Sequence, residues 1–234
     1  MRRILIPVIA VLLLLPAVNN AFAQDDDEEV WLRSPLKFAL SAELGIGMPL
    51  GPEAFNDLWN SSFPLTIAFG YAIIPYIEVK GWATYTSWGI SSIPAKEAIG
   101  YPGVTTINGG GITVVMYGAS AKVIAFPNSR MTPYIEIGGG AYQVTADDLT
   151  VSRDGEPVIS NSMEGSNGGL ITGAFGMQHG VNLRWTAYTE FNYYYGLSDT
   201  FAPGNLLLRN ENSPEVEGER LQIGSIVLGI ALGF

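Results

Sequence analysis

The last fourteen residues, LQIGSIVLGIALGF (Leu221–Phe234), alternate bulky apolar side chains with mostly small ones. The bulky frame, counted back by twos, is Phe234, Leu232, Ile230, Leu228 and Ile226, and the other frame is Gly233, Ala231, Gly229, Val227 and Ser225. A period of two indicates a β-strand, whose successive side chains point to opposite faces. Chain ends usually fray, so a strand that stays regular to its final residue predicts an end paired in a sheet.

The same alternation predicts seven earlier strands, at residues 36–46, 65–71, 76–88, 112–126, 133–144, 169–178 and 183–195. Short connections (72–75, 127–132, 179–182) alternate strictly with long ones (48–62, 89–111, 145–168, 196–219). In an antiparallel meander every second connection lies at the same end, so all long loops share one end. The fold class is therefore all-β, an up-and-down antiparallel barrel of eight strands. A hairpin hidden in 145–168 or 196–219 would make ten.

The first 23 residues have the three parts of a secretory signal peptide. Met1-Arg2-Arg3 is a positive start, Ile4–Val18 is apolar, and Ala21-Phe22-Ala23 is an A-x-A cleavage site. The alternative is a membrane-anchor helix, for which the apolar run is short. Residues 24–35 then form an acidic leader, and residues 36–234 form the barrel domain.

Composition narrows the function classes. The chain has no Cys, which excludes a disulfide framework and a thiolate metal site. Loss of Arg2 and Arg3 with the signal peptide would leave 10 Lys+Arg against 22 Asp+Glu, so nucleic acid is not an expected partner. Mean hydropathy is positive, yet after the signal peptide no apolar run reaches the length of a spanning helix. A membrane-spanning barrel would place this apolar surface against lipid.

Seven charged residues share the frame opposite the apolar one, and they are Glu43, Glu78, Lys80, Lys122, Glu136, Arg184 and Glu190. A charge on the lipid face near the midplane would cost about 2–4 kcal/mol, so these residues should face the lumen. We expect an ion-paired layer that plugs the barrel. The alternative is a narrow passive channel, lined by the same charges, for ions or small solutes.

Aromatic residues in the apolar frame fall near predicted strand ends. They are Phe69, Tyr71, Tyr85, Trp185 and Tyr193. Aromatic girdles of this kind lie at the two interfaces of membrane barrels. The pattern therefore predicts where the barrel meets the lipid headgroups.

The chain resembles the small outer-membrane β-barrel family of the OmpA/OmpX type. The resemblance rests on the signal peptide, the strand starts IPYIEVKGW and TPYIEIGGGAY, and the C-terminal LQIGSIVLGIALGF. It implies a monomer in the outer membrane of a Gram-negative-type bacterium, with short periplasmic turns and long external loops. It also implies folding by the barrel assembly machinery, which would read Ile226, Leu228, Ile230, Leu232 and Phe234 as a signal.

No catalytic residue, metal ligand or cofactor is predicted. Enzymes among the barrels that this chain resembles rely on a His near the outer rim or lipid face, whereas the single His, His179, falls in a short connection. Glu43 and Glu190 alone are a weak glycosidase signal. The four long loops hold 13 Asp+Glu against Lys96, Arg153 and Arg209, so divalent cations or a surface ligand are possible partners there.

Overall fold

The computed structural model describes residues 37–91, 95, 106–127, 129–153, 155–162, 165–182, 184–203 and 217–234. The expected signal peptide and acidic leader lie outside the described residues. No helix among the described residues is long and apolar enough to cross a membrane.

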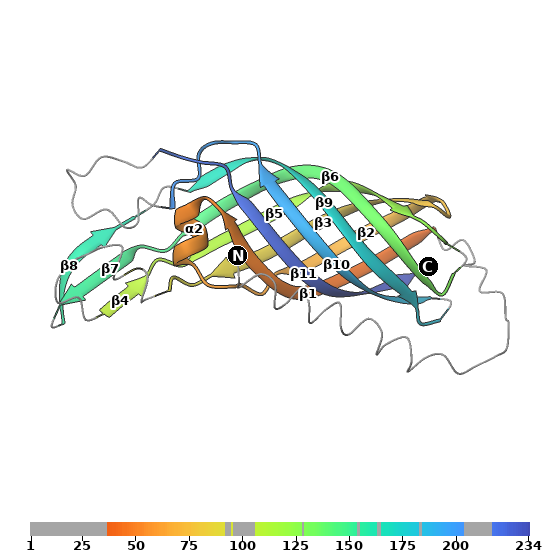
Figure 1. Ribbon diagram of the computed structural model, residues 1–234, viewed down its shortest axis with the longest axis horizontal. Coiled ribbons are helices and arrows are strands. Elements are labelled where there is room, and N and C mark those ends of the chain that lie inside the picture. The colour runs from red at the N-terminus through yellow and green to blue at the C-terminus, as the bar shows by residue number, and fades with distance from the viewer. Residues whose placement is uncertain are drawn as a thin grey trace. The chain divides into compact units, whose positions relative to one another are not determined.

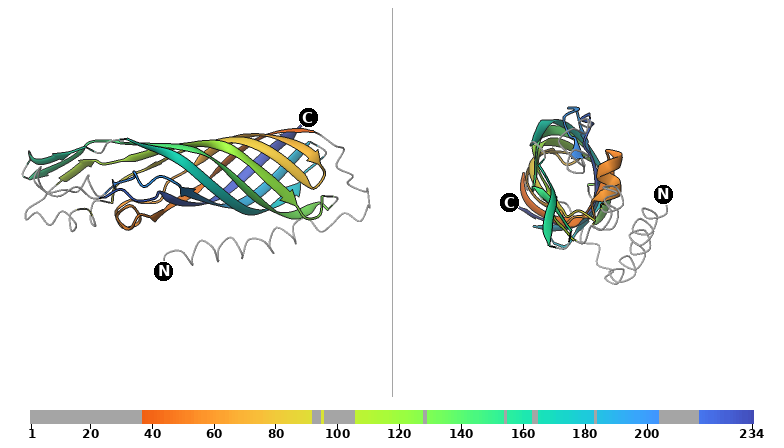
Figure 2. Two further views of the ribbon diagram at one scale, coloured as in Figure 1. Left: turned by 90° about the horizontal axis from the view of Figure 1, so that it is seen from above. Right: turned by 90° about the vertical axis from the view of Figure 1, so that its left-hand side faces the viewer.

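Eight antiparallel strands close into a barrel, in the order β1-β11-β10-β9-β6-β5-β3-β2 (Figure 1). Their bounds are β1 (Phe38–Gly51), β2 (Leu65–Ile74), β3 (Ile77–Trp88), β5 (Ile112–Ile124), β6 (Met131–Ala146), β9 (Ser166–Gly180), β10 (Trp185–Gly196) and β11 (Gln222–Gly233). The predicted up-and-down barrel is confirmed. Seen end-on, the strands form a closed ring (Figure 2, right).

A hairpin does exist within residues 145–168, but it does not enter the barrel. Its strands, β7 (Leu149–Arg153) and β8 (Glu156–Asn161), form a separate three-stranded sheet with β4 (Thr106–Gly109). β6 pairs directly with β9, from Met131 opposite His179 to Val144 opposite Ser166. This pairing leaves no place for two more strands, so the barrel has eight.

The connections alternate between the two ends as predicted. Residues 75–76, 125–130 and 181–184 join strands at the end where the last residue, Phe234, lies (Figure 1). The described parts of the four long connections lie at the opposite end and include the short helix α2 (Glu53–Leu58). We call these the short-turn end and the long-loop end.

The barrel closes by pairing its last strand with its first. β1 pairs with β11 from Ala39 opposite Gly233 onward. The Phe234 N–H donates to the Phe38 carbonyl at 2.9 Å, and the Phe38 N–H donates to the Phe234 carbonyl at 3.2 Å. The regular alternation of the C-terminal segment therefore continues because every residue is needed to complete the seam.

The two frames of β11 face opposite environments. Leu228 is 67% exposed on the outer surface, whereas its neighbour Val227 is 2% exposed inside the barrel. The outer surface of the other strands is apolar in the same way, with exposed residues including Leu40, Leu44, Ile67, Val115, Ile135, Ile137, Ile171 and Phe175. A barrel leaves no unpaired sheet edge, so this apolar wall suits hydrocarbon.

Replacing Leu228 with arginine is expected to lower the free energy of unfolding by about 2–4 kcal/mol, because the charge would enter the apolar outer wall, which we expect to face lipid. Urea titration of the barrel refolded in vesicles, read by gel mobility without heating, measures the change. Phe63→Arg is the matched control, since Phe63 is exposed in a long loop and should change stability by no more than about 1 kcal/mol. Equal effects of the two substitutions would contradict a lipid-facing β11.

Candidate functional site

The centre of the barrel interior holds a buried charged layer organised around Lys80 on β3. The Lys80 Nζ lies 2.8 Å from Glu136 Oε2 of β6 and 3.7 Å from Glu43 Oε1 of β1. Both carboxylates are buried, as is Glu190 on β10, which is 2% exposed. One ammonium thus joins acids from strands on either side of it, which ties distant parts of the wall together.

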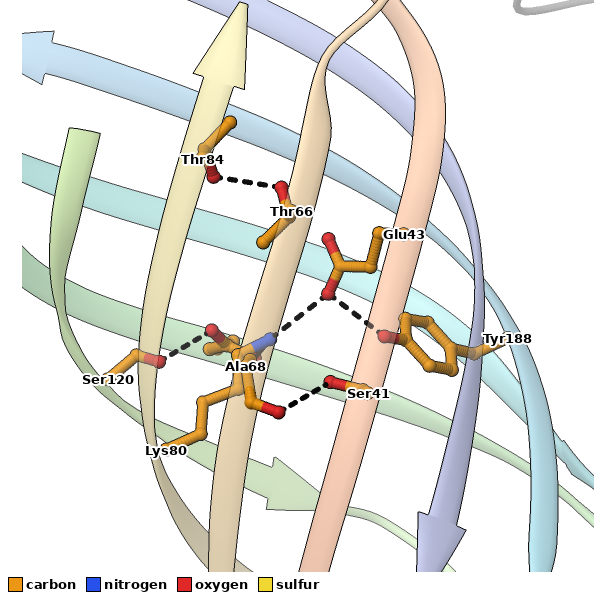
Figure 3. Close-up of polar contacts among 9 residues, drawn as sticks. Ser41, Glu43, Thr66, Ala68, Lys80, Thr84, Ser120 and Tyr188 are labelled. Atoms are coloured by element: carbon orange, nitrogen blue, oxygen red, sulfur yellow. Dashed lines mark hydrogen bonds and ion pairs between the residues drawn. The ribbon is translucent and has the colours of Figure 1, made fainter. Parts of the chain in front are cut away.

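Neutral side chains each donate one hydrogen bond to the two paired carboxylates. Ser120 Oγ of β5 donates to Glu136 Oε1 at 2.7 Å, and the Tyr188 hydroxyl of β10 donates to Glu43 Oε1 at 2.9 Å. Figure 3 shows Glu43 between Lys80 and Tyr188. Buried ion pairs require such additional partners, because desolvation otherwise exceeds the attraction between the charges.

Lys122 occupies the same layer through aromatic faces. Its Nζ lies 4.0 Å from the ring centroid of Tyr134 and 5.5 Å from that of Tyr188. Its backbone partner across the sheet is Glu78 of β3. A cation over an aromatic ring is stabilised by the ring quadrupole, more strongly when the contact is desolvated.

Glycines on neighbouring strands make room for these rings. A side chain at Gly229 would collide with the Tyr188 ring, and one at Gly176 would collide with the Tyr134 ring. The small frame of the C-terminal strand therefore has a specific purpose at Gly229. It admits the aromatic group that donates to Glu43.

Arg184 does not belong to the charged layer, which corrects the prediction. It is exposed in the turn before β10, and Asn182 Oδ1 accepts the backbone N–H groups of both Arg184 and Trp185 at 2.9 Å. The alternation was correct, but this turn ends at Arg184, one residue before the strand begins. The structure brings Glu43, Lys80, Lys122, Glu136 and Glu190 together inside the barrel, with Glu78 half-buried beside them.

A second, apolar layer fills the interior toward the long-loop end, which the sequence did not predict because we expected a polar lumen. Its buried residues include Trp82, Trp88, Ile112, Val114, Met116, Tyr142, Val144, Leu170, Tyr194 and Ile223. Phe55 of α2 covers this layer, with its ring 5.3 Å from that of Trp88 and 5.1 Å from that of Phe201. The helix is anchored next to Phe55 by Trp59 Nε1, which donates to the Gly110 carbonyl at 2.8 Å.

The residues that sequence reasoning missed share the inward frame with the charges. Tyr134 lies two residues before Glu136, and Tyr188 lies two residues before Glu190. Alternation alone could have placed both in the lumen. The apolar layer carried no such signal, because residues 112–117 are largely apolar in both frames.

The predicted girdle residues lie at the outer surface, but Phe69 is in the middle of β2 and not near its end. Phe69, Tyr71, Tyr85 and Trp185 are exposed, and Tyr193 is half-buried with its hydroxyl donating to Gln222 Oε1 at 3.0 Å. Phe38 joins this set at the seam, where its ring lies 5.7 Å from Phe69 and 6.1 Å from Phe234. The terminal aromatic is therefore part of a packed cluster.

His179 lies on β9 near the short-turn end, away from the long loops. Among the described residues, no three or more His, Asp or Glu side chains gather in a way that could hold a metal ion.

Comparison with solved structures places this architecture among known proteins. The chain aligns with outer membrane protein OprG from Pseudomonas aeruginosa at a TM-score of 0.54 and 12% identity, covering 85% of this chain and 95% of that one. The alignment with Neisserial surface protein A has a TM-score of 0.51 and 13% identity, and it covers 84% of this chain and 97% of that one. The alignment with a major outer membrane protein from Thermus thermophilus has a TM-score of 0.50 and 10% identity, and it covers 83% of this chain and 99% of that one.

The chain has the fold of small outer-membrane β-barrels. No protein-family model and no curated protein matches the sequence. The OmpA/OmpX-type barrel expected from the sequence is thus confirmed at the level of the fold. At this low identity, no residue role can be transferred from the solved structures to the charged layer or the apolar layer.

Proposed function

We propose that this protein is an outer-membrane barrel that anchors and presents its long loops at the cell surface, with a lumen closed to solutes. The observation that carries the proposal is that two layers of side chains, one charged and one apolar, fill the interior. The Lys80 cluster occupies the middle, and the apolar layer under Phe55 occupies the long-loop half. An eight-stranded barrel is just wide enough for side chains to fill.

A narrow passive channel fits these observations less well. An ion crossing the apolar layer would leave water without meeting a compensating charge, which is expensive. Lys80 would also have to leave two carboxylates in the charged layer below. We therefore assign a structural or surface-interaction role, without catalysis.

The wall and the ends of the barrel support an outer-membrane location. The apolar outer surface and its aromatic residues suit a lipid bilayer, and we assign residues 1–23 as the signal peptide that exports the chain. The short turns then face the periplasm and the long loops face outside. The barrel assembly machinery would recognise the outward frame from Ile226 to Phe234.

The long loops supply an acidic external surface. Their described acids are all exposed, and they are Glu53, Asp57, Asp147, Asp148, Glu156, Asp199, Glu217 and Glu219. Arg220 fixes the base of the last long loop, since its Nε lies 2.6 Å from Asp199 Oδ1 and its Nη1 lies 2.9 Å from the Tyr195 hydroxyl. We propose that divalent cations or a basic partner bind this surface.

An epitope inserted after Gly155 is expected to bind antibody on intact cells. Gly155 lies at the tip of the β7–β8 hairpin, where an added side chain would meet open space. The matched control is the same epitope after Ser129 in a short turn, which should be labelled only after the outer membrane is permeabilised. Labelling of the Ser129 insertion on intact cells would reverse the orientation and contradict the proposal.

A further inference from the structure

The short-turn end of the barrel carries a repeated basic residue. Four strands begin at this end, and three of them follow directly on a basic side chain: Lys37 before β1, Arg130 before β6 and Arg184 before β10. Lys37 and Arg184 are exposed, and Arg130 is half-buried. Their strands alternate with β11 and β9 along one side of the barrel, so successive basic residues lie on strands about 10 Å apart. We call these three residues the basic rim.

Two acidic groups lie at the same end as the basic rim. Among the described residues of the short-turn end, the acidic groups are Glu78 and the terminal carboxylate of Phe234. Glu78 points into the barrel, because its carboxylate lies where a side chain on Gly70 would be and its strand position is opposite Lys122. The described acids of the long loops lie at the opposite end, so most of the described negative charge outside the barrel interior is remote from the basic rim.

Exposed apolar side chains surround the basic rim. Trp185 directly follows Arg184, and Phe38 directly follows Lys37 and packs against Phe234. The short turns themselves expose Ile73, Ile74, Tyr76 and Phe126. Aromatic and apolar residues next to basic ones are typical of the boundary between hydrocarbon and headgroups. In the proposed membrane, this arrangement would bring the rim to the depth of lipid phosphates.

We propose that the basic rim binds the headgroups of anionic phospholipids in the leaflet that the short turns face. The proposal rests on the proposed membrane location and adds a lipid class to it. Guanidinium and ammonium groups pair with phosphate through charge-assisted hydrogen bonds. A basic side chain near an anionic membrane surface contributes attraction that corresponds to about a fivefold change in affinity.

Trp185 offers a local probe, since the indoles of Trp59, Trp82 and Trp88 are buried inside the protein. The full chain with Trp31→Phe would be refolded in phosphatidylcholine vesicles that contain a small fraction of brominated phosphatidylglycerol or, separately, of brominated phosphatidylcholine. Bromine quenches indole fluorescence on contact. At low salt we expect phosphatidylglycerol to associate at least fivefold more strongly than phosphatidylcholine, with the preference lost at about 1 M salt as the Debye length falls to about 3 Å.

The double substitution Lys37→Gln/Arg184→Gln should remove most of this preference. Arg220→Gln is the matched control, because it deletes an exposed guanidinium at the other end and should leave the preference intact. Equal quenching of Trp185 by the two brominated lipids, in the protein that keeps all three rim residues, would overturn the proposal. The proposal also fails if the preference for phosphatidylglycerol appears only after Asp25, Asp26 and Asp27 are changed to Asn. In that case the acidic leader, and not lipid, would pair with the rim in the unaltered protein. If neither brominated lipid quenches Trp185, the membrane location itself fails.

Discussion

Replacing Lys80 with methionine is expected to lower the free energy of unfolding of the barrel by about 3–5 kcal/mol, the cost of removing one partner from a buried ion pair. Lys80 is buried and sits 2.8 Å from Glu136 and 3.7 Å from Glu43. Without its ammonium, two adjacent carboxylates lose their shared counter-charge, and Glu190 remains buried close by. Urea titration in vesicles, read by gel mobility without heating, measures the loss.

A double-mutant cycle separates this pairing from simple loss of packing. Glu136→Gln alone leaves Lys80 with a weaker partner, and the Lys80→Met/Glu136→Gln variant removes both charges of the shortest pair. If the two residues are coupled, the double variant should lose less stability than the two single variants added together. Lys37→Met serves as the control for deleting an exposed ammonium. A Lys80→Met barrel as stable as the Lys37→Met barrel would contradict an organising role for Lys80.

Replacing Trp88 with alanine is expected to cost about 3–5 kcal/mol, as large-to-small substitutions of aromatic residues in packed cores do. Trp88 is 1% exposed and meets Phe55 edge to face, so its removal leaves a cavity beneath α2. The same urea titration measures the loss. Trp185→Ala is the matched control, because it removes an indole from the outer surface and leaves the interior filled. Equal losses for the two variants would argue against a packed layer under Phe55.

The sequence predicted the fold well because a barrel with an apolar outer wall requires a single alternation on every strand. Once Leu228 faces outward, Val227 must face the interior, and the same parity placed Glu43, Lys80 and Glu136 inside together. Parity says nothing about which of these residues touch. The contacts depend on strand register and on neighbours such as Ser120. Only the structure shows these.

Two features of the site escaped prediction for different physical reasons. Inward and outward side chains are both largely apolar around Val114, so alternation could not reveal that the long-loop half of the lumen is filled. Arg184 has the correct parity but precedes the first paired residue of β10, and strand boundaries depend on turn hydrogen bonds such as those to Asn182. The β7–β8 hairpin was recognisable as a possible pair of strands, yet the direct pairing of β6 with β9 shows that it lies outside the barrel.

Single-channel recording of the refolded full chain in a planar bilayer is the decisive test of the closed lumen. We predict no sustained open events, because an ion would have to pass both the Lys80 cluster and the apolar layer beneath Phe55. Lys80→Met alone should remain closed, since the apolar layer is intact, whereas that substitution combined with Trp88→Ala should raise the frequency of brief openings. Large, stable openings of the unaltered protein would contradict a lumen closed to solutes.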